Sequence, residues 1–451
     1  MLIDDLRHDE YGAGGHPYLQ TPNIDRLSRE GVSFTRAFHT TPLCSPNRAC
    51  ILTGEYASKH GIFNNVGRDR LSAQLRTFTR ALQASGYATA HIGKWHMGDS
   101  AAPRPGYDYW VSFAGQGKII DPQINEDGRT KQVSGYVTDI LTDRAVHFLT
   151  DRRDRSRPFC LFLAHKAVHP DTLQRADGSI DMTAEMGYLA APRHRGRYAD
   201  REFAVPRSAV NPGARMGSRV LERVLERKAS AENVREFGSV LNEGSDQQGI
   251  RDRAEMMLSV DEGIGRLLEV LENQGELENT AVVFTSDNGY FFGEHGLTIE
   301  RRFPYEECIR SPLLVRFPAR FDSGRRVTEL VSMIDIAPTL LELGGVDIGS
   351  HVQGRSLMPL LTGRNARGRD AVFVEYYSHD HPMPWILDVD YRALRTARHK
   401  LIHWVQYPDL DELYDLQDDP LEMNNLAGRD GKLQAELRAT LLRMIGESIS
   451  L

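Results

Sequence analysis

The chain has 451 residues, of which 40% are hydrophobic and 26% charged, a composition typical of an ordinary globular protein. Its length exceeds the usual size of one domain and predicts a large domain with a smaller companion. The formal net charge of −7 argues against a general nucleic-acid binder. No apolar run approaches the roughly 20 residues that span a bilayer, so we expect neither a nucleic-acid partner nor a membrane span.

The beginning of the chain is unusual, because Met1-Leu2-Ile3 leads directly into Asp4-Asp5. A strand usually has about five or six residues, so we expect most of the first strand to be missing, as in a fragment or a late start. No signal peptide precedes the acidic pair. The compartment is therefore left open, and a periplasmic or secreted location fits if an export signal was lost with the strand.

Strands and helices alternate through the first half of the chain. Pro22 suits the first turn of a helix and Gly31 its end, while continuous apolar runs are typical of strands buried on both faces. This alternation predicts an α/β fold, with a mostly parallel sheet covered by helices on both sides. Further helices are expected at 74–84, 139–149 and 250–273, and strands at 88–92, 159–163 and 281–284.

Two regions depart from this alternation. Residues 170–245 are polar, rich in Arg and Gly and without a strong period, and we interpret them as an insertion near the functional site. From about residue 366 the pattern predicts short antiparallel strands at 372–374, 391–394 and 400–405, with a helix at 432–444. We therefore expect a main domain over 1–365 and a smaller α+β subdomain with an antiparallel sheet over 366–451.

The stretch around Cys44 has the features of a helix start. Ser45 can cap the helix, Pro46 fits its first turn, and Gly54 is a typical stop. Cys44 would then lie at the positive end of a short helix, which favours an anion. Arg48, one turn further on, could contact that anion or a metal-bound oxygen. The alternative is an ordinary buried cysteine before a capped helix.

Polar oxygen ligands follow two predicted strands. Asp4 and Asp5 come after the first strand, and Asp287 and Asn288 follow the strand near 281–284. Functional groups gather beyond the carboxyl ends of parallel strands, and three carboxylates with an amide oxygen suit Ca²⁺ or Mg²⁺. The alternative is that the first pair caps a helix and the second makes a tight turn.

Basic residues also follow two other predicted strands. Lys94 and His96 come after 88–92, and their spacing places both side chains on one face if the segment is extended. Lysine suits an anion, and histidine can orient or deprotonate a hydroxyl. His169 and its neighbour His165 both follow 159–163. For Lys94 and His96 the alternative is a solvated pair on the surface. For His169 the alternative is a loop histidine without a functional role.

These motifs together resemble the type I sulfatases of the alkaline phosphatase superfamily, over residues 1 to about 427. Cys44-Ser45-Pro46-Asn47-Arg48 and the following six residues resemble the family's first signature, and Gly93-Lys94-Trp95-His96 its second. Residues 293–297 and 300–307 resemble the next block, except that Arg301 replaces the usual sulfate-binding lysine. A planar guanidinium fork is not equivalent to a lysine point charge. Within the family, the chain looks most like N-acetylglucosamine-6-sulfatases that act on glycans.

The resemblance implies an alkaline-phosphatase-like fold and hydrolysis of sulfate esters on a sulfated carbohydrate or an aryl sulfate. A formylglycine-generating enzyme would oxidise Cys44 to formylglycine, whose hydrated aldehyde attacks sulfur beside Ca²⁺, or alternatively Mg²⁺. Lys94, Arg48 and Arg301 would neutralise the sulfate oxygens, His169 with Lys94 would protonate the leaving oxygen, and His96 would act as base. The implied metal ligands are Asp4, Asp5, Cys44, Asp287 and Asn288.

The resemblance also implies a loop from the C-terminal subdomain that closes the pocket. The candidates are Asp380 and His381, expected on the rim above position 44, with Trp385 stacking on the sugar ring. The alternative is a polar hairpin tip with an exposed aromatic.

Three other functions remain open from the sequence. A phosphonate or phosphodiester hydrolase of the same superfamily would share the metal site, the formylglycine motif and the cations. A non-catalytic sulfated-glycan binder would result if Cys44 is never oxidised. A metal-independent cysteine hydrolase is least favoured, because the sequence places no Asn or Asp partner that would orient a histidine near Cys44.

Overall fold

The computed structural model describes residues 1–181, 187–209, 218–230, 246–298, 300–364, 366–379 and 383–450. Strands of the described part form three sheets, of ten, four and three strands. The three-stranded sheet has the order β10-β3-β13. Its strands are β10 Arg310–Ser311, β3 Ala37–Phe38 and β13 Val331–Ser332.

The ten-stranded sheet has the order β12-β2-β11-β9-β1-β8-β4-β5-β6-β7. Its five central strands, from β9 to β5, are parallel to one another, and antiparallel pairs occur only toward the two edges. The strands are β1 Leu2–Ile3, β2 Val32–Phe34, β4 Ala88–Gly93, β5 Tyr109–Ser112, β6 Gln123–Glu126, β7 Arg129–Gln132, β8 Phe159–Ala164, β9 Val282–Ser286, β11 Leu313–Arg316 and β12 Arg325–Val327.

Helices cover both faces of this sheet. Successive strand side chains point to opposite faces, and accordingly Ile3 belongs to a hydrophobic cluster with α1, α6 and α9, whereas Leu2 belongs to a second cluster with α2, α5 and α11. The helices are α1 Pro22–Glu30, α2 Cys44–Thr53, α3 Ala57–His60, α4 Asp69–Ser72, α5 Phe78–Ala84, α6 Val137–His147, α7 Arg219–Ser230, α9 Gln247–Asn273, α10 Glu306–Ile309, α11 Ile336–Leu343, α12 Met358–Leu361 and α13 Gly431–Ser450.

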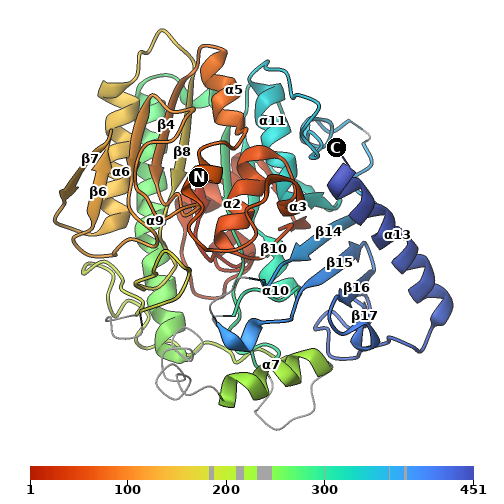
Figure 1. Cartoon of the computed structure of the whole chain (residues 1–451). Coiled ribbons are helices and arrows are strands. Elements are labelled where there is room, and N and C mark those ends of the chain that lie inside the picture. Colours follow the sequence, from red (N-terminus) through yellow and green to blue (C-terminus); the bar gives the residue numbers. More distant parts are fainter. Residues whose placement is uncertain are drawn as a thin grey trace.

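The four-stranded sheet is antiparallel throughout, and α13 packs along it (Figure 1). Its strands are β14 Ala371–Tyr376, β15 Tyr391–Thr396, β16 His399–Trp404 and β17 Glu412–Asp415. The predicted fold class, a mostly parallel sheet covered by helices together with a small antiparallel sheet, is confirmed. The division into domains 1–365 and 366–451 stays a prediction. Side chains of β14, β15 and β16 share a hydrophobic cluster with Tyr290 and Tyr305 of the preceding region.

Some sequence expectations need correction. The helix expected at 74–84 begins only at Phe78, whose preceding Thr77 accepts a capping hydrogen bond from the N–H of Arg80. Residues 170–245, which showed no strong period in the sequence, contain α7. The buried stripe of α7 consists of Val220, Leu221 and Val224. Because polar residues flank these three positions, the apolar pattern was too short to indicate a helix in the sequence. Residues 182–186, 210–217 and 231–245 of this region lie outside the described part.

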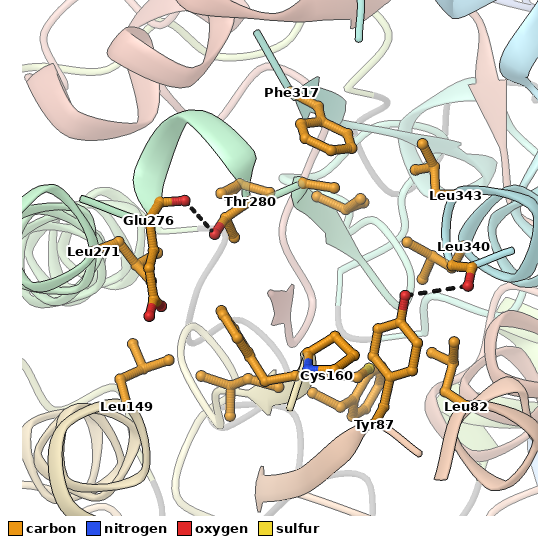
Figure 2. Close-up of a pocket in the computed structure, with 18 of the residues that line it drawn as sticks. Leu82, Tyr87, Leu149, Cys160, Leu271, Glu276, Thr280, Phe317, Leu340 and Leu343 are labelled. Atoms are coloured by element: carbon orange, nitrogen blue, oxygen red, sulfur yellow. Dashed lines mark hydrogen bonds between the residues drawn. The ribbon is translucent and has the colours of Figure 1, made fainter. Parts of the chain in front are cut away.

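A cavity of about 670 Å³ lies beside the amino ends of the central strands, lined largely by apolar side chains such as Leu82 and Leu340 (Figure 2). The Met1 ammonium group at its wall donates to the carbonyl of Val283 at 2.6 Å, and burial lowers its pKa to about 5. None of the predicted functional residues lines this cavity. Among the described residues, no helix combines the length and apolar character needed to cross a bilayer.

Candidate active site

The order of the central strands brings the predicted functional residues together. β1 pairs with β9 on one side and β8 on the other, in registers that align Ile3 with Ser286 and Leu2 with Ala164. Asp4 and Asp5 therefore leave the sheet beside Asp287 and Asn288. Because β8 also pairs with β4 in parallel, the segment with Lys94 leaves at the same edge. This is the edge at which open α/β sheets bind ligands.

Cys44 is the first residue of α2 and is fully buried at this edge. Leu43, in extended conformation, is the residue before the helix, so the prediction that Ser45 caps it is wrong. The Ser45 hydroxyl instead donates to the carbonyl of His96, which ties the first turn of α2 to the segment after β4. The helix ends as predicted, at Gly54 in the left-handed conformation (φ 71°).

Each of three buried carboxylates is paired with a buried cation. The positive charges compensate the negative ones, which offsets much of the cost of removing the carboxylates from water. The pairs are Lys94 Nζ with Asp4, Arg48 Nε with Asp287 Oδ2 at 2.8 Å, and Arg301 Nε with Asp5 Oδ1 at 2.7 Å. The guanidinium of Arg301 also lies 3.8 Å from Cys44 Sγ, which in turn lies 3.9 Å from Asp5 Oδ1.

The oxygen atoms of this cluster suit a hard divalent cation. Asp4 Oδ1, Asp5 Oδ2 and Asn288 Oδ1 are buried and have no hydrogen-bond partner among the described residues. The Asn288 amide is oriented by a hydrogen bond from its Nδ2 to Asp5 Oδ1 at 2.7 Å. This orientation leaves the amide oxygen available to a cation. Asp4, Asp5 and Cys44 each offer one ligand atom, and these atoms all lie within 4.8 Å of one another. Buried carboxylate and amide oxygens without donors are the ligands that Ca²⁺ and Mg²⁺ prefer.

Asp287 differs from its neighbours in that both of its oxygens accept hydrogen bonds, Oδ1 from the N–H of Asp5 at 3.0 Å and Oδ2 from Arg48. Burial, reinforced by the charges of Asp4 and Asp5, raises its pKa to about 7. Burial alone would also raise the pKa of Asp4, but Lys94 and other nearby cations outweigh it and lower that pKa well below its usual range. A bound cation would hold all these carboxyls in the ionised form.

Burial raises the pKa of the Cys44 thiol to about 12, although Lys94 and Arg301 act in the opposite direction. The unmodified thiol is therefore protonated near neutral pH, and the thiol is a much weaker nucleophile than the thiolate. The sequence indicated no Asn or Asp partner that would orient a histidine near Cys44. In the structure such a residue is present, because Asp5 lies 3.9 Å from both Cys44 Sγ and His169 Nε2. The protonated thiol is the stronger reason to exclude that chemistry.

His169 lies at the centre of the site. Its Nδ1 donates to the carbonyl of Pro170 at 2.8 Å, so Nε2 carries the lone pair and accepts from Arg301 Nη2, also at 2.8 Å. Burial, together with the nearby Lys94, lowers its pKa well below the usual value. His165 is equally buried, but neither of its ring nitrogens has a hydrogen-bond partner among the described residues.

Lys94 and His96 point to different partners. His96 has a left-handed backbone (φ 59°), so the segment is not extended and the prediction that both side chains share one face is wrong. Lys94 reaches Asp4, whereas His96 Nε2 lies 2.6 Å from Gln174 Oε1. Sequence reasoning missed Gln174, which is one polar residue in a polar stretch with no motif around it.

The predicted substrate loop is only partly described. Asp380 and His381 lie outside the described residues, and their role stays a prediction. Trp385, expected to stack on a sugar, is only 5% exposed and belongs to the hydrophobic cluster around β14–β16. This burial leaves its ring little surface to offer to a ligand.

Comparisons with known proteins agree with these observations. Residues 1–346 match the family model described as Sulfatase, and residues 293–447 match the model described as N-sulphoglucosamine sulphohydrolase, C-terminal. An N-acetylglucosamine-6-O-sulfatase of Bacteroides thetaiotaomicron is 34% identical, over 98% of this chain and 84% of that protein. An N-acetylglucosamine-6-sulfatase of Capra hircus is 27% identical, over 95% of this chain and 79% of that protein.

Among solved structures, one complex of a protein with its substrate D-glucosamine-2-N,6-O-disulfate superposes with a TM-score of 0.82. The two sequences are 32% identical, and the match covers 99% of this chain and 97% of the other. The similarity therefore extends over the ten-stranded sheet and the antiparallel sheet alike.

Proposed function

This chain belongs to the sulfatase family and is a sulfuric ester hydrolase of sulfated carbohydrate, and we propose that it acts through a formylglycine at position 44 and a bound divalent cation. The observation that carries the proposal is the arrangement around Cys44. Three buried carboxylates, three buried cations and an amide oxygen surround the first turn of α2. Besides this cluster, the proposed reaction requires the modification, the ion and two histidines, His169 and His96.

The charges of the site support a sulfate ester as the substrate. The site holds three negative and three positive side chains, so their charges cancel. The proposal depends on these six residues and on Asn288, namely Asp4, Asp5, Asp287, Lys94, Arg48, Arg301 and Asn288. A divalent cation held by the carboxylates and Asn288 would polarise the sulfate and leave the site with a net positive charge. Preorganised positive charge in a water-excluded site stabilises the negative charge that develops on sulfate oxygens during transfer.

The nucleophile has to differ from the encoded cysteine, because the buried thiol is protonated near neutral pH. Oxidation by a formylglycine-generating enzyme would supply a hydrated aldehyde, whose hydroxyl is an oxygen nucleophile. Residue 44 lies at the positive end of α2, where helix N–H groups favour an anion. Arg301, 3.8 Å from Cys44 Sγ, is positioned to contact a sulfate oxygen at the same place.

Two histidines supply proton transfer in the proposal. His169, with Lys94, donates a proton to the departing sugar oxygen, and His96 acts as the base that regenerates the resting site. Such acid–base catalysis contributes roughly 10²–10⁴-fold to a rate. Both imidazoles are buried and have pKa values well below the usual one, mainly because of burial. His169 therefore takes up its proton only with the substrate's negative charge beside it.

The relatives support a glucosamine-type sugar sulfated at the 6-position as the substrate. Asp380 and His381 are the proposed contacts to the sugar hydroxyls, as a carboxylate and an imidazole that accept and donate hydrogen bonds.

Mass spectrometry of the peptide that contains residue 44 tests the proposal. After co-expression with a formylglycine-generating enzyme, the thiol mass should be replaced by that of the aldehyde or its hydrate. The matured protein should then release sulfate from a 6-sulfated glucosamine faster than it cleaves a phosphodiester of similar size. An unmodified, inactive protein that still binds the sugar would indicate a glycan-binding protein, and faster phosphodiester cleavage would indicate the related hydrolase.

A further inference from the structure

The imidazole of His96 is held by a hairpin from the region between β8 and α7. Gln174 and Ile180 form an isolated antiparallel bridge, and the N–H of Arg175 donates to the carbonyl of Ser179 at 2.8 Å. From this hairpin the Gln174 side chain reaches His96 Nε2 at 2.6 Å. His96 is 4% exposed, so water does not compete freely for this hydrogen bond.

The orientation of the Gln174 amide follows from its other partners. Its Nε2 donates to the carbonyl of Gly178 at 2.9 Å, and a carbonyl can only accept. The Oε1 atom therefore faces His96, and it also accepts from Gln116 Nε2 at 3.1 Å. Turning the amide over would place two acceptors against each other at Gly178, so one orientation is strongly favoured.

The orientation of the amide fixes the tautomer of the imidazole. An amide oxygen accepts only, so His96 Nε2 must carry a hydrogen. Burial, with help from the charge of Lys94, lowers the pKa of His96 well below its usual value, and the ring is neutral. Its lone pair is therefore on Nδ1, which is buried and has no hydrogen-bond partner among the described residues.

We infer that Gln174 is a positioning residue that holds His96 in the Nε2–H tautomer and so leaves Nδ1 as the base. This inference rests on the proposed function, in which His96 accepts a proton. The hydroxyl proton at position 44 would move to Nδ1 while its bonding electrons stay on oxygen, and the ring would become an imidazolium. Gln174 Oε1 accepts from Nε2–H in both states, so the hydrogen bond persists through the transfer.

The surroundings of His96 explain why the tautomer needs a partner. The carbonyl of His96 accepts from Ser45, which joins it to the first turn of α2 beside position 44. The charged groups that act on the ring are Lys94, Asp4 and Arg48. Without an acceptor at Nε2, the hydrogen on that atom would be buried without a partner, and the tautomer with hydrogen on Nδ1 would become competitive.

The direct test is ¹⁵N NMR of the histidine-labelled full-length protein, with the His96 signals assigned by their loss in His96→Gln. We expect a proton-bound Nε2 and a proton-free Nδ1 in the wild type. Gln174→Leu, which has a similar volume but no acceptor, should shift hydrogen toward Nδ1. A wild-type spectrum with the hydrogen on Nδ1 would overturn the inference.

Kinetics with a small aryl sulfate provide the second readout. Gln174→Leu should lower kcat by about 10-fold, a part of the roughly 10²–10⁴-fold that acid–base catalysis supplies, and leave KM unchanged. Gln174→Glu keeps an acceptor for Nε2–H and should recover most of kcat. The matched control is Gln116→Leu, which removes a neighbour of the same amide but leaves the acceptor for His96, and should keep both the tautomer and kcat.

The outcomes separate this inference from the proposed function. Equal losses in Gln116→Leu and Gln174→Leu, or a wild-type kcat in Gln174→Leu, would overturn the positioning role. The NMR pattern does not depend on turnover. A protein that has the expected tautomer and loses it in Gln174→Leu, yet shows no aldehyde and no sulfatase activity, would support the inference and remove the proposed function.

Discussion

Replacement of Arg301 by alanine is the most informative single change in this site. With the described residues the guanidinium makes three contacts at once, with Asp5 Oδ1 at 2.7 Å through Nε and with His169 Nε2 at 2.8 Å and Cys44 Sγ at 3.8 Å through Nη2. Alanine removes all three. The neighbouring Arg302 is the matched control, because it has the same chemistry, is also buried, and has no hydrogen bond to the site residues within the described part of the chain.

The expected loss can be estimated from the role of the contact. Removal of one preorganised donor to a developing negative charge typically costs about 10²–10³-fold in kcat, so we expect Arg301→Ala to fall in this range. Arg301 also compensates the charge of the buried Asp5. We therefore expect Arg301→Ala to lower the free energy of unfolding as well, by up to about 3–5 kcal/mol, the cost of leaving a buried charge unpaired. Arg302→Ala should lose less than about 3-fold in kcat/KM, since it removes no transition-state contact.

The assay is kcat/KM of the matured protein with a small aryl sulfate, with the aldehyde content measured for each variant so that rates are compared per active site. Thermal unfolding of the same samples separates loss of structure from loss of catalysis. Arg301→Ala with more than a tenth of the wild-type rate, or an equal loss in Arg302→Ala, would refute this reading of the site.

Three further predictions test other parts of the site. Asp287→Ala should abolish activity and lower the bound Ca²⁺ measured by elemental analysis, while far-ultraviolet circular dichroism stays near wild type; full metal content in this variant would exclude Asp287 as a ligand. Cys44→Ala should be inactive, and Cys44→Ser should be inactive too unless a serine-type maturase is present; a fully active Cys44→Ala would contradict the proposed nucleophile. Asp380→Ala/His381→Ala should raise KM for a sulfated sugar and leave an aryl sulfate almost unchanged, because these side chains would supply uniform binding to the sugar; equal losses on both substrates would mean that the loop affects folding or chemistry.

The fold and the strand-end residues were predictable because both depend on local patterns. Continuous apolar runs at 159–163 and 281–284 indicated buried parallel strands, and β8 and β9 occupy these positions. Asp4-Asp5 and Asp287-Asn288 each followed such a strand. Their meeting required only that the two strands be neighbours, which the pairing of β1 with β9 provides.

The errors concern contacts that no local pattern encodes. Ser45 has the right chemistry for a cap, but its hydroxyl finds the carbonyl of His96, a partner 51 residues away in the sequence. Gln174 has no signature at all, since its role depends on the Gly178 carbonyl and on a histidine in another segment. Trp385 was grouped with the polar loop residues Asp380 and His381 as a contact to the sugar, yet its ring packs into the core.

The contacts of Arg301 show what an arginine provides in place of the usual lysine. A lysine ammonium is a point charge, whereas the guanidinium presents Nε and Nη2 in a fixed fork. Here Nε pairs with Asp5 while Nη2 contacts both His169 and Cys44. The fork therefore joins a proposed metal ligand, the proposed acid and the nucleophile position through one rigid group. The positive charge that the family's lysine supplies is kept, and the added donor Nη2 gives a hydrogen bond to His169 Nε2.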